Sequence, residues 1–423
     1  MHPTLDLQHL FRQDLAGSEP AEENSVPDIL HAIRNHLNME VAFVAEFKRG
    51  QRIFRYVDSD WQNNPVKINQ GNPLEESYCQ RIVDGRLPEL IQDACVHPAA
   101  RQLGVTQAIP VGAHMSVPIH LSDGSLYGTF CCFSRTGDKS LNLRDLSLMR
   151  VFAELATKMI ERERKLSTLR NNSRARIERV LSGQGLSMVF QPIVDIRHQR
   201  ITGYEALARF GAELSAAGPD RWFRDAHLAG LGVELELHAI EMALSVLPLL
   251  DKTLDIAVNA SPETILDPRL AALFERIAPT DRVVLEITEH AAVERYEAIA
   301  QCLKTYREHG LKIAVDDAGA GYASFRHILN LNPDRIKLDM SLTRDIDADP
   351  ARRALAAALI HFSAETGSTL VAEGVETAAE LATLRELGVN KAQGYFLGWP
   401  VSAEQLLASP TPGEASGDHA LID

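Results

Sequence analysis

The sequence predicts an α/β protein in which an α+β domain and a long helix precede a closed barrel of alternating strands and helices, a (β/α)8 fold. The 423 residues are enough for two or three domains. From about residue 183 onward, short apolar runs alternate with helix-length stretches, which is typical of βαβ units and a parallel sheet. Before about residue 142, a helix, strands and a hairpin occur without that rhythm and indicate a separate α+β domain.

Composition excludes several classes of protein. With 45% hydrophobic and 24% charged residues, disorder over most of the chain is excluded. The net charge of −14 argues against broad binding to duplex nucleic acid or anionic membranes. The 5 cysteines are too scattered for a disulfide framework or a CxxC metal site. No signal-peptide pattern and no apolar run of about 18 residues is found, so we expect a cytoplasmic protein without membrane insertion.

The first domain is expected at residues 25–142, after a flexible, polar and acidic N-terminus at residues 1–24. Apolar residues at helical spacing predict a helix at 28–37. Asp123-Gly124 separates two β-rich runs and predicts a hairpin. The other expected elements, with the two hairpin strands, are strands at 39–47, 52–57, 115–121 and 126–133 and helical segments at 74–84 and 98–103.

A long helix is expected at residues 143–182. Its apolar residues Leu146, Met149, Ala153, Ala156 and Ile160 have the spacing of a coiled-coil seam, but the pattern lasts only about two heptads. Residues 161–179 are rich in arginine. A solvated linker helix is favoured over an anion-binding patch, and a dimerising helix that transmits a signal is the alternative.

The barrel is expected at residues 183–408, followed by a flexible tail at 409–423. Its many short runs fit a closed barrel better than an open sheet. The expected strands lie at 187–195, 201–209, 255–261, 282–289, 311–317, 335–339, 369–376 and 391–398.

Polar residues interrupt or end nearly every one of these strands. They are Gln191, Glu205, Asn259, Glu286, Asp316 with Asp317, Lys337, Glu373 and Gln393. A charge inside an apolar strand is costly unless it is paired or bound to a metal. One such residue alone is well explained by an ion pair, but in a barrel all of them converge on the C-terminal mouth, where such folds have their active sites.

The chemistry of these side chains indicates a metal-assisted reaction on phosphate. Glu205, Asn259, Glu286, Asp316 and Asp317 offer only oxygen ligands, which suit Mg²⁺ or Mn²⁺, and their number indicates two ions. Lys337 can meet phosphate or developing negative charge, and Arg209 can bind a phosphate. Glu373 is placed to orient or deprotonate an attacking water.

Residues 183–408 resemble an EAL domain, the family of cyclic di-GMP phosphodiesterases named for the tripeptide that stands here at 205–207. The resemblance extends over about 225 residues and rests on many motifs in order. They are QPIV at 191–194, YEALAR at 204–209, NASPETIL at 259–266, LEITE at 285–289, DDAGAGYASF at 316–325, IKLD at 336–339, AEGVET at 372–377 and QGYFLG at 393–398.

This resemblance implies hydrolysis of cyclic di-GMP to linear pGpG with two Mg²⁺ or Mn²⁺ ions. It implies that Lys337 assists water and phosphate, that Glu373 is a general base or further metal contact, and that Glu376 braces the loop after Asp317. The implied metal ligands are Glu205, Asn259, Glu286, Asp316 and Asp317, and the implied substrate contacts are Gln191, Arg209 and Gln393. The family also uses that loop at a dimer interface, so a homodimer through the barrel and the linker helix is expected.

One departure from the family pattern lies in this loop. The family usually has DDFGTG, whereas Ala318 and Ala320 stand here in place of Phe and Thr. The departure affects loop control and basal rate rather than the ligands. The alternatives are a catalytically weak cyclic di-GMP receptor and, more distantly, a metal-dependent barrel acting on another phosphodiester. No GGDEF-like motif is found, so synthesis of the dinucleotide is not expected.

Residues 25–142 resemble a GAF sensor domain through the hairpin MSVPIHLSDGSLYGTFCCF, although more weakly. Such domains bind small molecules or only dimerise, so an unidentified small ligand is one expectation. Cys131 and Cys132 are interpreted as core residues. Cys79 and Cys95 can carry a chromophore or sense redox state, but inert packing is favoured. His114 is interpreted as a satisfied polar residue rather than a haem ligand.

Overall fold

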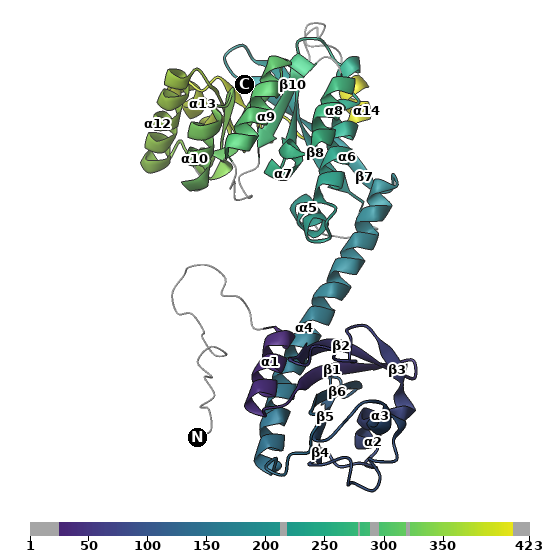
Figure 1. Cartoon of the computed structure of the whole chain (residues 1–423). Coiled ribbons are helices and arrows are strands. Elements are labelled where there is room, and N and C mark those ends of the chain that lie inside the picture. The colour runs from purple at the N-terminus through teal and green to yellow at the C-terminus, as the bar shows by residue number, and fades with distance from the viewer. Residues whose placement is uncertain (1–24, 212–217, 278–279, 288–295, 319–321, 409–423) are drawn as a thin grey trace. The chain divides into compact units, whose positions relative to one another are not determined.

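The computed structural model describes residues 25–211, 218–277, 280–287, 296–318 and 322–408, without the side chains of Asp317 and of residues 322–325. The chain forms two compact units, residues 1–168 and 169–423, and the boundary lies within one continuous helix, α4 (Leu143–Leu181) (Figure 1). The terminal segments that we expected to be flexible, 1–24 and 409–423, lie outside the described residues.

The first helix of the N-terminal unit, residues 1–168, is α1 (Val26–His36), at the position expected from the sequence. Ser25 and Asp28 form a capping box at its N-terminus, which satisfies backbone donors that have no partner inside the helix. These hydrogen bonds with Ser25 lower the pKa of Asp28. Val26, Ile29, Leu30 and Ile33 form its buried face, in agreement with the apolar spacing of the sequence.

A six-stranded antiparallel sheet forms the centre of this unit, in the order β3-β2-β1-β6-β5-β4. The expected hairpin is confirmed as the β5–β6 pair. The strands are β1 (Val41–Lys48), β2 (Gln51–Ser59), β3 (Gly71–Pro73), β4 (Leu90–Ile91), β5 (His114–His120) and β6 (Leu126–Phe133).

The sheet has a hydrophobic core on each face. Helix α1 and the first part of α4 pack on one face, and the other face is covered by two short helices, α2 (Tyr78–Val83) and α3 (Gly104–Ala108) (Figure 1). A single turn, η2 (Leu74–Glu76), precedes α2. Neighbouring residues of a strand point to opposite faces. Cys132 therefore belongs to the core beneath α1 and α4, and Cys131 to the core beneath α2.

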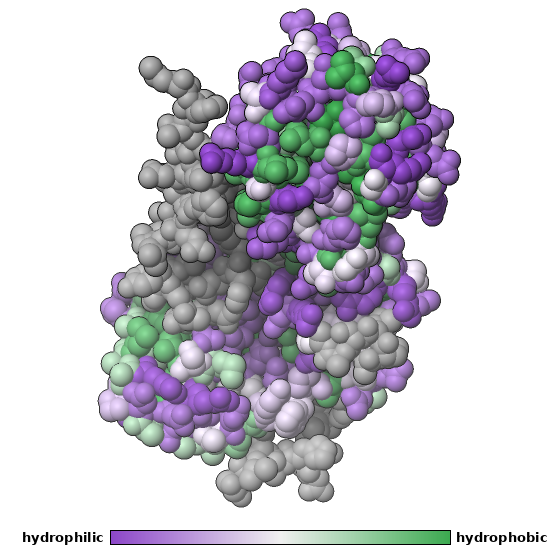
Figure 2. Space-filling model, turned by 90° about the horizontal axis from the view of Figure 1, so that it is seen from below, coloured by the Kyte–Doolittle hydropathy of each residue, from purple (hydrophilic) through white to green (hydrophobic). Residues whose placement is uncertain are grey.

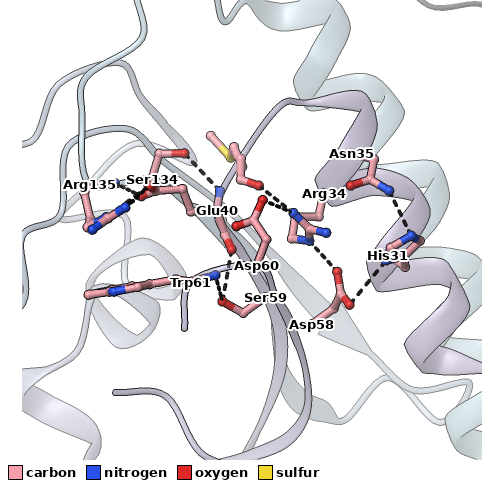
Figure 3. A network of polar contacts seen from close by, with 11 residues as sticks. His31, Arg34, Asn35, Glu40, Asp58, Ser59, Asp60, Trp61, Ser134 and Arg135 are labelled. Atoms are coloured by element: carbon pink, nitrogen blue, oxygen red, sulfur yellow. Dashed lines mark hydrogen bonds and ion pairs between the residues drawn. The ribbon is translucent and has the colours of Figure 1, made fainter. Parts of the chain in front are cut away.

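A network of charged residues joins α1 to the end of β2 (Figure 3). Arg34, 6% exposed, pairs with Asp58 and Asp60, and the Asp60 contact is 2.9 Å long. Burial opposes the charge of the guanidinium, but the two aspartates outweigh it and raise the pKa of Arg34. Nearby, Arg135 pairs with Glu40 (Figure 3) and lies over the ring of Trp61. All of these contacts are between residues of the same unit, and those of Arg34 hold α1 on the sheet.

Two sequence predictions for this unit need correction. The helix expected at 98–103 is wrong: these residues form turns, and α3 begins only at Gly104. The His97 side chain accepts from the Ala100 amide, and the Thr106 hydroxyl donates to the Ala100 carbonyl, so side chains compete with a regular helix for the backbone groups of Ala100.

The second correction concerns α4, which itself has the expected extent. Leu146, Met149, Ala153, Ala156 and Ile160 are all buried in the core of the N-terminal unit. The apolar stripe reflects packing of α4 on its own sheet and is not a seam open to a second helix. Further along, Ile177 and Val180 pack with Trp222, Ala226, Leu231 and Leu235 of the second unit.

The second unit contains the expected barrel. Its strand order is β14-β13-β12-β11-β10-β9-β8-β7-β15, and pairing of β14 with β7 closes it. The sequence predicted a parallel sheet, but β7 is antiparallel to both β8 and β14. The strands are β7 (Leu186–Asp195), β8 (Arg200–Phe210), β9 (Asp255–Ala260), β10 (Val283–Ile287), β11 (Lys312–Ala318), β12 (Arg335–Leu338), β13 (Thr369–Ala372), β14 (Lys391–Ala392) and β15 (Val401–Ser402).

Helices connect these strands and bury their outer faces in one large apolar core. The helices are α5 (Pro219–Leu228), α6 (Gly232–Leu244), η3 (Leu247–Leu249), α7 (Pro262–Leu266), α8 (Pro268–Arg276), η4 (Thr280–Arg282), α9 (Tyr296–Glu308), α10 (Tyr322–Leu331), α11 (Met340–Thr343), α12 (Pro350–Thr366), α13 (Ala378–Leu387) and α14 (Ala403–Ala408).

Figure 2 shows a face on which hydrophilic residues predominate and hydrophobic residues gather in patches between them. Within the described ranges, none of the helices combines the length and the apolar character needed to cross a bilayer.

Candidate active site

The period of the strands brings the polar residues of the barrel to its interior. A small apolar cluster consists of Ile193, Ala257, Val284, Ala314 and Val371, each from a different strand. Moving two residues along a strand returns to the same face of the sheet. From these apolar residues, that step leads toward the mouth to Gln191 on the antiparallel β7, Asn259 on β9, Glu286 on β10, Asp316 on β11 and Glu373 after β13. The site therefore lies directly above an apolar layer of the barrel.

Lys337 lies at the centre of this site, 2% exposed. Its Nζ is 2.7 Å from Glu286 Oε2 and 2.7 Å from Glu373 Oε1. It is also 3.1 Å from Asp316 Oδ1 and 3.3 Å from Glu205 Oε2. One ammonium group thus contacts four carboxylates that come from four different parts of the barrel.

The charges around Lys337 are not balanced. Burial disfavours the ammonium form, but the four carboxylates outweigh burial and raise the pKa of Lys337 well above its usual value. Burial is also the main cause that raises the pKa of Glu286 to about 8, against the opposing effect of Lys337. Burial and the neighbouring carboxylates raise the pKa of Glu373 well above its usual value too. The cluster holds more carboxylates than its one ammonium can neutralise, so it favours additional positive charge.

Amide side chains hold Glu205 in place. Gln393 donates from Nε2 to Glu205 Oε2 at 2.7 Å and to Gln191 Oε1 at 3.0 Å. Asn259 donates to Glu205 Oε1 at 3.3 Å. Gln393 Oε1 is buried and finds no hydrogen-bond partner in the part of the chain that the structure describes. This acceptor is available for a donor outside the described residues.

Not all predicted site residues lie in this cluster. Arg209 is exposed, and its Nη1 donates to the Ala208 carbonyl at 2.9 Å. Glu376 is exposed and accepts from Arg344 at 2.8 Å. The backbone of Asp317 belongs to β11, but its side chain and the loop residues 319–321 lie outside the described residues. The roles predicted for these three residues stay predictions.

An aromatic pair at the rim was missed by the sequence analysis. The rings of Tyr395 and Trp399 stack at 4.0 Å with an interplanar angle of 8°, and Trp399 is 65% exposed. The turn that carries them starts at Gly394, where φ is +158° and an added Cβ would lie 2.2 Å from the Val375 backbone nitrogen. Gln191 donates to the Gly398 carbonyl at 3.4 Å, which links this turn to the amide residues. Two aromatics four residues apart, directly after Gln393, were the signal available in the sequence.

The donor set fits hard divalent cations. Glu205, Asn259, Glu286 and Asp316 offer carboxylate and amide oxygens in a cluster with surplus negative charge. Among the side chains that the structure describes, no group of three or more acidic, histidine or cysteine residues is arranged around an open metal position. The Nζ of Lys337 lies instead among the carboxylates, and the ligand set predicted from the sequence includes Asp317, whose side chain is not described.

Comparisons with known proteins agree with this architecture. The EAL domain family model matches residues 174–400, and the GAF domain model matches residues 22–161. The cyclic di-GMP phosphodiesterase PA2567 of Pseudomonas aeruginosa is 31% identical over 232 residues, which are 53% of this chain and 40% of that protein. An uncharacterized protein of Mycobacterium bovis, Mb1392c, is 33% identical over 223 residues, which are 49% of this chain and 73% of that protein.

Several curated relatives are much longer than the matched region, and the chain covers 34%, 40% and 33% of three of them. Among solved structures, the EAL enzyme Bd1971 in its cAMP- and cyclic-di-GMP-bound form has a TM-score of 0.55 at 16% identity. The similarity covers 87% of this chain and 92% of that one and shows a shared fold. The chain belongs to the EAL-domain family and carries a GAF domain before its barrel.

Proposed function

We propose that this protein is a cyclic di-GMP phosphodiesterase that hydrolyses one phosphodiester bond to give linear pGpG. The observation that carries the proposal is the contact of Lys337 with four carboxylates inside the mouth of an EAL barrel. A relative with 31% identity over the barrel carries the name of this activity, which supports the assignment. A site rich in carboxylates around a buried lysine can hold divalent cations, which with the lysine neutralise negative charge on phosphate.

The proposed cofactors are two Mg²⁺ or Mn²⁺ ions. Glu205, Asn259, Glu286, Asp316 and Asp317 would hold them, because these residues supply the oxygen donors that such ions prefer. When bound, the ions lower the pKa of water and neutralise charge on the phosphoryl oxygens.

The side chains of the barrel perform the remaining steps. Glu373 Oε1, now 2.7 Å from Lys337 Nζ, accepts a proton from the attacking water. Lys337 keeps its positive charge because of the surrounding carboxylates and offsets the charge of the phosphate. Gln191 and Gln393, buried beside Glu205, and the exposed Arg209 bind the dinucleotide. Water attacks phosphorus, the bond from phosphorus to the ribose oxygen breaks, and that oxygen takes up a proton as the ring of the substrate opens.

Three finer points belong to the same proposal. The protein acts in the cytoplasm as a homodimer, which forms through the barrel and α4. The apolar stripe at 146–160 is already buried, so only the exposed part of α4 is available for this contact. The GAF domain regulates the barrel, with or without a small ligand. Glu376 braces the loop after Asp317. Sedimentation of the full-length protein tests the dimer, and a monomer at micromolar concentration contradicts it.

Turnover of cyclic di-GMP by the full-length protein tests the proposed activity. The protein is incubated with substrate and Mg²⁺ or Mn²⁺, and the nucleotides are separated. We expect linear pGpG, formed only with metal, and at least about a hundredfold less of it from the Glu205→Gln variant. Glu241→Gln, a surface residue paired with Arg276, is the matched control and keeps full activity. Tight binding without product contradicts the proposal and favours a cyclic di-GMP receptor.

A further inference from the structure

Two cysteine sulfurs lie close together in the core of the GAF domain. Cys79 Sγ on α2 is 3.6 Å from Cys131 Sγ on β6. Both residues are 0% exposed, although 52 residues separate them in the chain. The sheet places Cys132, the neighbour of Cys131, in the opposite core, so it cannot take part in this contact. The fold thus selects one pair from the five cysteines of the chain.

A buried arginine is in contact with one of the two sulfurs. Arg52, 6% exposed, donates from Nη1 to Cys79 Sγ at 3.3 Å. Its guanidinium also lies 4.7 Å from the ring centroid of Phe54 and donates from Nε to Asn72 Oδ1 at 3.0 Å. Among the described residues, no carboxylate forms an ion pair with Arg52 at salt-bridge distance. The positive charge of Arg52 is therefore directed at a sulfur atom, where it favours a thiolate.

The second sulfur has a different environment. Cys131 Sγ lies 3.0 Å from Ser116 Oγ and 3.2 Å from Thr129 Oγ1, and the arginine contact belongs to Cys79. Burial would raise the pKa of Cys79, but the hydrogen bond with Cys131 and the charge of Arg52 lower it to about 5. Burial and the same hydrogen bond raise the pKa of Cys131 well above its usual value. The pair thus combines a thiolate at Cys79 with a thiol at Cys131, as in reactive dithiols.

We propose that Cys79 and Cys131 are a redox-sensitive dithiol that closes to an intramolecular disulfide when a peroxide oxidises Cys79. The Cys79 thiolate attacks one oxygen of hydrogen peroxide, the O–O bond breaks, and hydroxide leaves and is protonated to water. Cys79 becomes a sulfenic acid. The sulfur of Cys131 then attacks the sulfur of Cys79, losing its proton, and the sulfenic oxygen leaves as water. Two thiols are oxidised by two electrons, and one peroxide is reduced to two waters.

Burial determines which oxidants reach the pair. Hydrogen peroxide is small and uncharged, whereas glutathione disulfide and aromatic disulfide reagents are large and charged. The sulfurs must approach by about 1.5 Å to reach the disulfide bond length. The bridge connects α2 to β6, so the oxidised state fixes the short helix to the centre of the sheet.

Peptide mapping of the full-length protein tests this proposal. The reduced, folded protein is treated with hydrogen peroxide, free thiols are blocked under denaturing conditions, and peptides are separated without reduction. We expect a linked peptide pair containing Cys79 and Cys131, which disappears on reduction. The Cys132→Ser variant, whose cysteine is equally buried, and the Cys95→Ser variant form the same bridge. Absence of this peptide pair, or its appearance only after the protein has been unfolded in urea, overturns the proposal.

Single variants test the separate roles of the two sulfurs. In Cys131→Ser, Cys79 stops at the sulfenic acid, which a dimedone probe labels. In Cys79→Ser, Cys131 remains a thiol and the probe gives no label. The reverse pattern overturns the assignment of Cys79 as the nucleophile. Since serine is close in size to cysteine, we expect both variants to fold, and circular dichroism checks this.

Replacing the arginine tests the contribution of its charge. We expect Arg52→Met to form the bridge at least about tenfold more slowly than the wild type, because the thiolate is less favoured. Arg52→Lys keeps the charge and retains most of the rate. If Arg52→Met does not fold, the pH dependence of bridge formation in Arg52→Lys and wild type decides the point. Equal rates in wild type and Arg52→Met, or a wild-type rate that does not fall as the pH is lowered through about 5, contradict a thiolate stabilised by Arg52.

Discussion

Gln393 donates a hydrogen bond to Glu205 at 2.7 Å, although 188 residues separate the two in the chain. This contact joins the residue that follows β14 to β8, the second strand of the barrel, at the mouth of the barrel. Gln393 also contacts Gln191 on β7, the strand that lies between them and closes the sheet. The amide of Gln393 therefore orients a proposed metal ligand from outside the ligand set.

We expect the Gln393→Ala variant to weaken metal-dependent turnover by about 10- to 100-fold, as is usual when a partner that orients a metal ligand is lost. The apparent affinity for Mg²⁺ or Mn²⁺, measured from the metal dependence of the initial rate, should fall. Gln301→Ala, on the exposed side of α9, is the control. An unchanged metal dependence in Gln393→Ala would show that Glu205 is positioned without this hydrogen bond.

The Lys337→Met variant should be less stable than the wild type. It leaves four buried or half-buried carboxylates without their ammonium, so the free energy of unfolding should fall by about 3 to 5 kcal/mol in a chelating buffer. Added Mg²⁺ should then raise the melting temperature of the variant more than that of the wild type. Thermal unfolding with and without metal measures both effects.

Lys391→Met is the matched control for this experiment. Burial, with the nearby charge of Arg335, lowers the pKa of Lys391 to about 8. The surroundings of Lys391 therefore disfavour its charged form, whereas those of Lys337 favour the charged form. We expect a much smaller loss of stability in Lys391→Met and no added response to Mg²⁺. Equal losses of unfolding free energy in the two variants would mean that Lys337 does not specifically stabilise the four carboxylates.

The Trp399→Ala variant should raise the KM for cyclic di-GMP by about fivefold or more, since stacking of one base on an aromatic ring contributes about 1 to 3 kcal/mol. The exposed rings of Tyr395 and Trp399 lie beside the turn that Gln191 contacts, where a guanine base of the proposed substrate can stack. Trp399→Phe keeps a flat ring and should retain most of the affinity. Steady-state kinetics give KM and kcat separately, and a fall in kcat alone would contradict a role in base binding.

The stability of the GAF domain should decrease as the pH falls below about 6.5. Burial, followed by the charge of Arg52, lowers the pKa of His114 to about 3. Between pH 6.5 and 3 the unfolded chain binds a proton that the folded chain does not, so unfolding becomes easier by about 1.4 kcal/mol for each unit of pH. Above about pH 6.5 the ring of His114 is neutral in both the folded and the unfolded chain, so the stability of the domain is not reduced there.

Calorimetric unfolding of wild type and His114→Phe at pH 7 and pH 5 measures this effect. Phenylalanine can keep the stacking on Tyr78, where the ring centroids are 4.6 Å apart, but it does not titrate. The difference in stability between the two proteins should therefore change with pH. A constant difference would show that the pKa of His114 is the same in the folded and the unfolded domain.

The sequence was sufficient for the parts of the site that follow from strand period. Glu205, Glu286, Asp316, Lys337 and Glu373 interrupt apolar strands, and polar groups in such positions are tolerated where they meet one another. Their convergence follows from a closed barrel alone. The reversed direction of β7 was also readable, because residues 196–199 are too few for a crossover between parallel strands.

Other features depend on information that a single strand or helix does not carry. The stripe of α4 from Leu146 to Ile160 has the same 3-4 spacing whether it packs on a second helix or on its own sheet. The Tyr395–Trp399 pair depends on the backbone of Gly394 and its close approach to Val375. The Cys79–Cys131 contact joins two elements 52 residues apart, and only the three-dimensional fold brings them together.

The closure of the barrel also has a consequence during translation. Among the strands of the barrel, β7 is synthesised first, whereas its partners β14 and β15 are synthesised last. The hydrogen bond from Gln191 to the Gly398 carbonyl can form only after another 207 residues have been synthesised. Until then one edge of β7 is unpaired, and such edges invite pairing with other nascent chains. The order of synthesis therefore leaves the first barrel strand open to such pairing until β14 and β15 have been made, and Gln191 and Gln393 can meet only then.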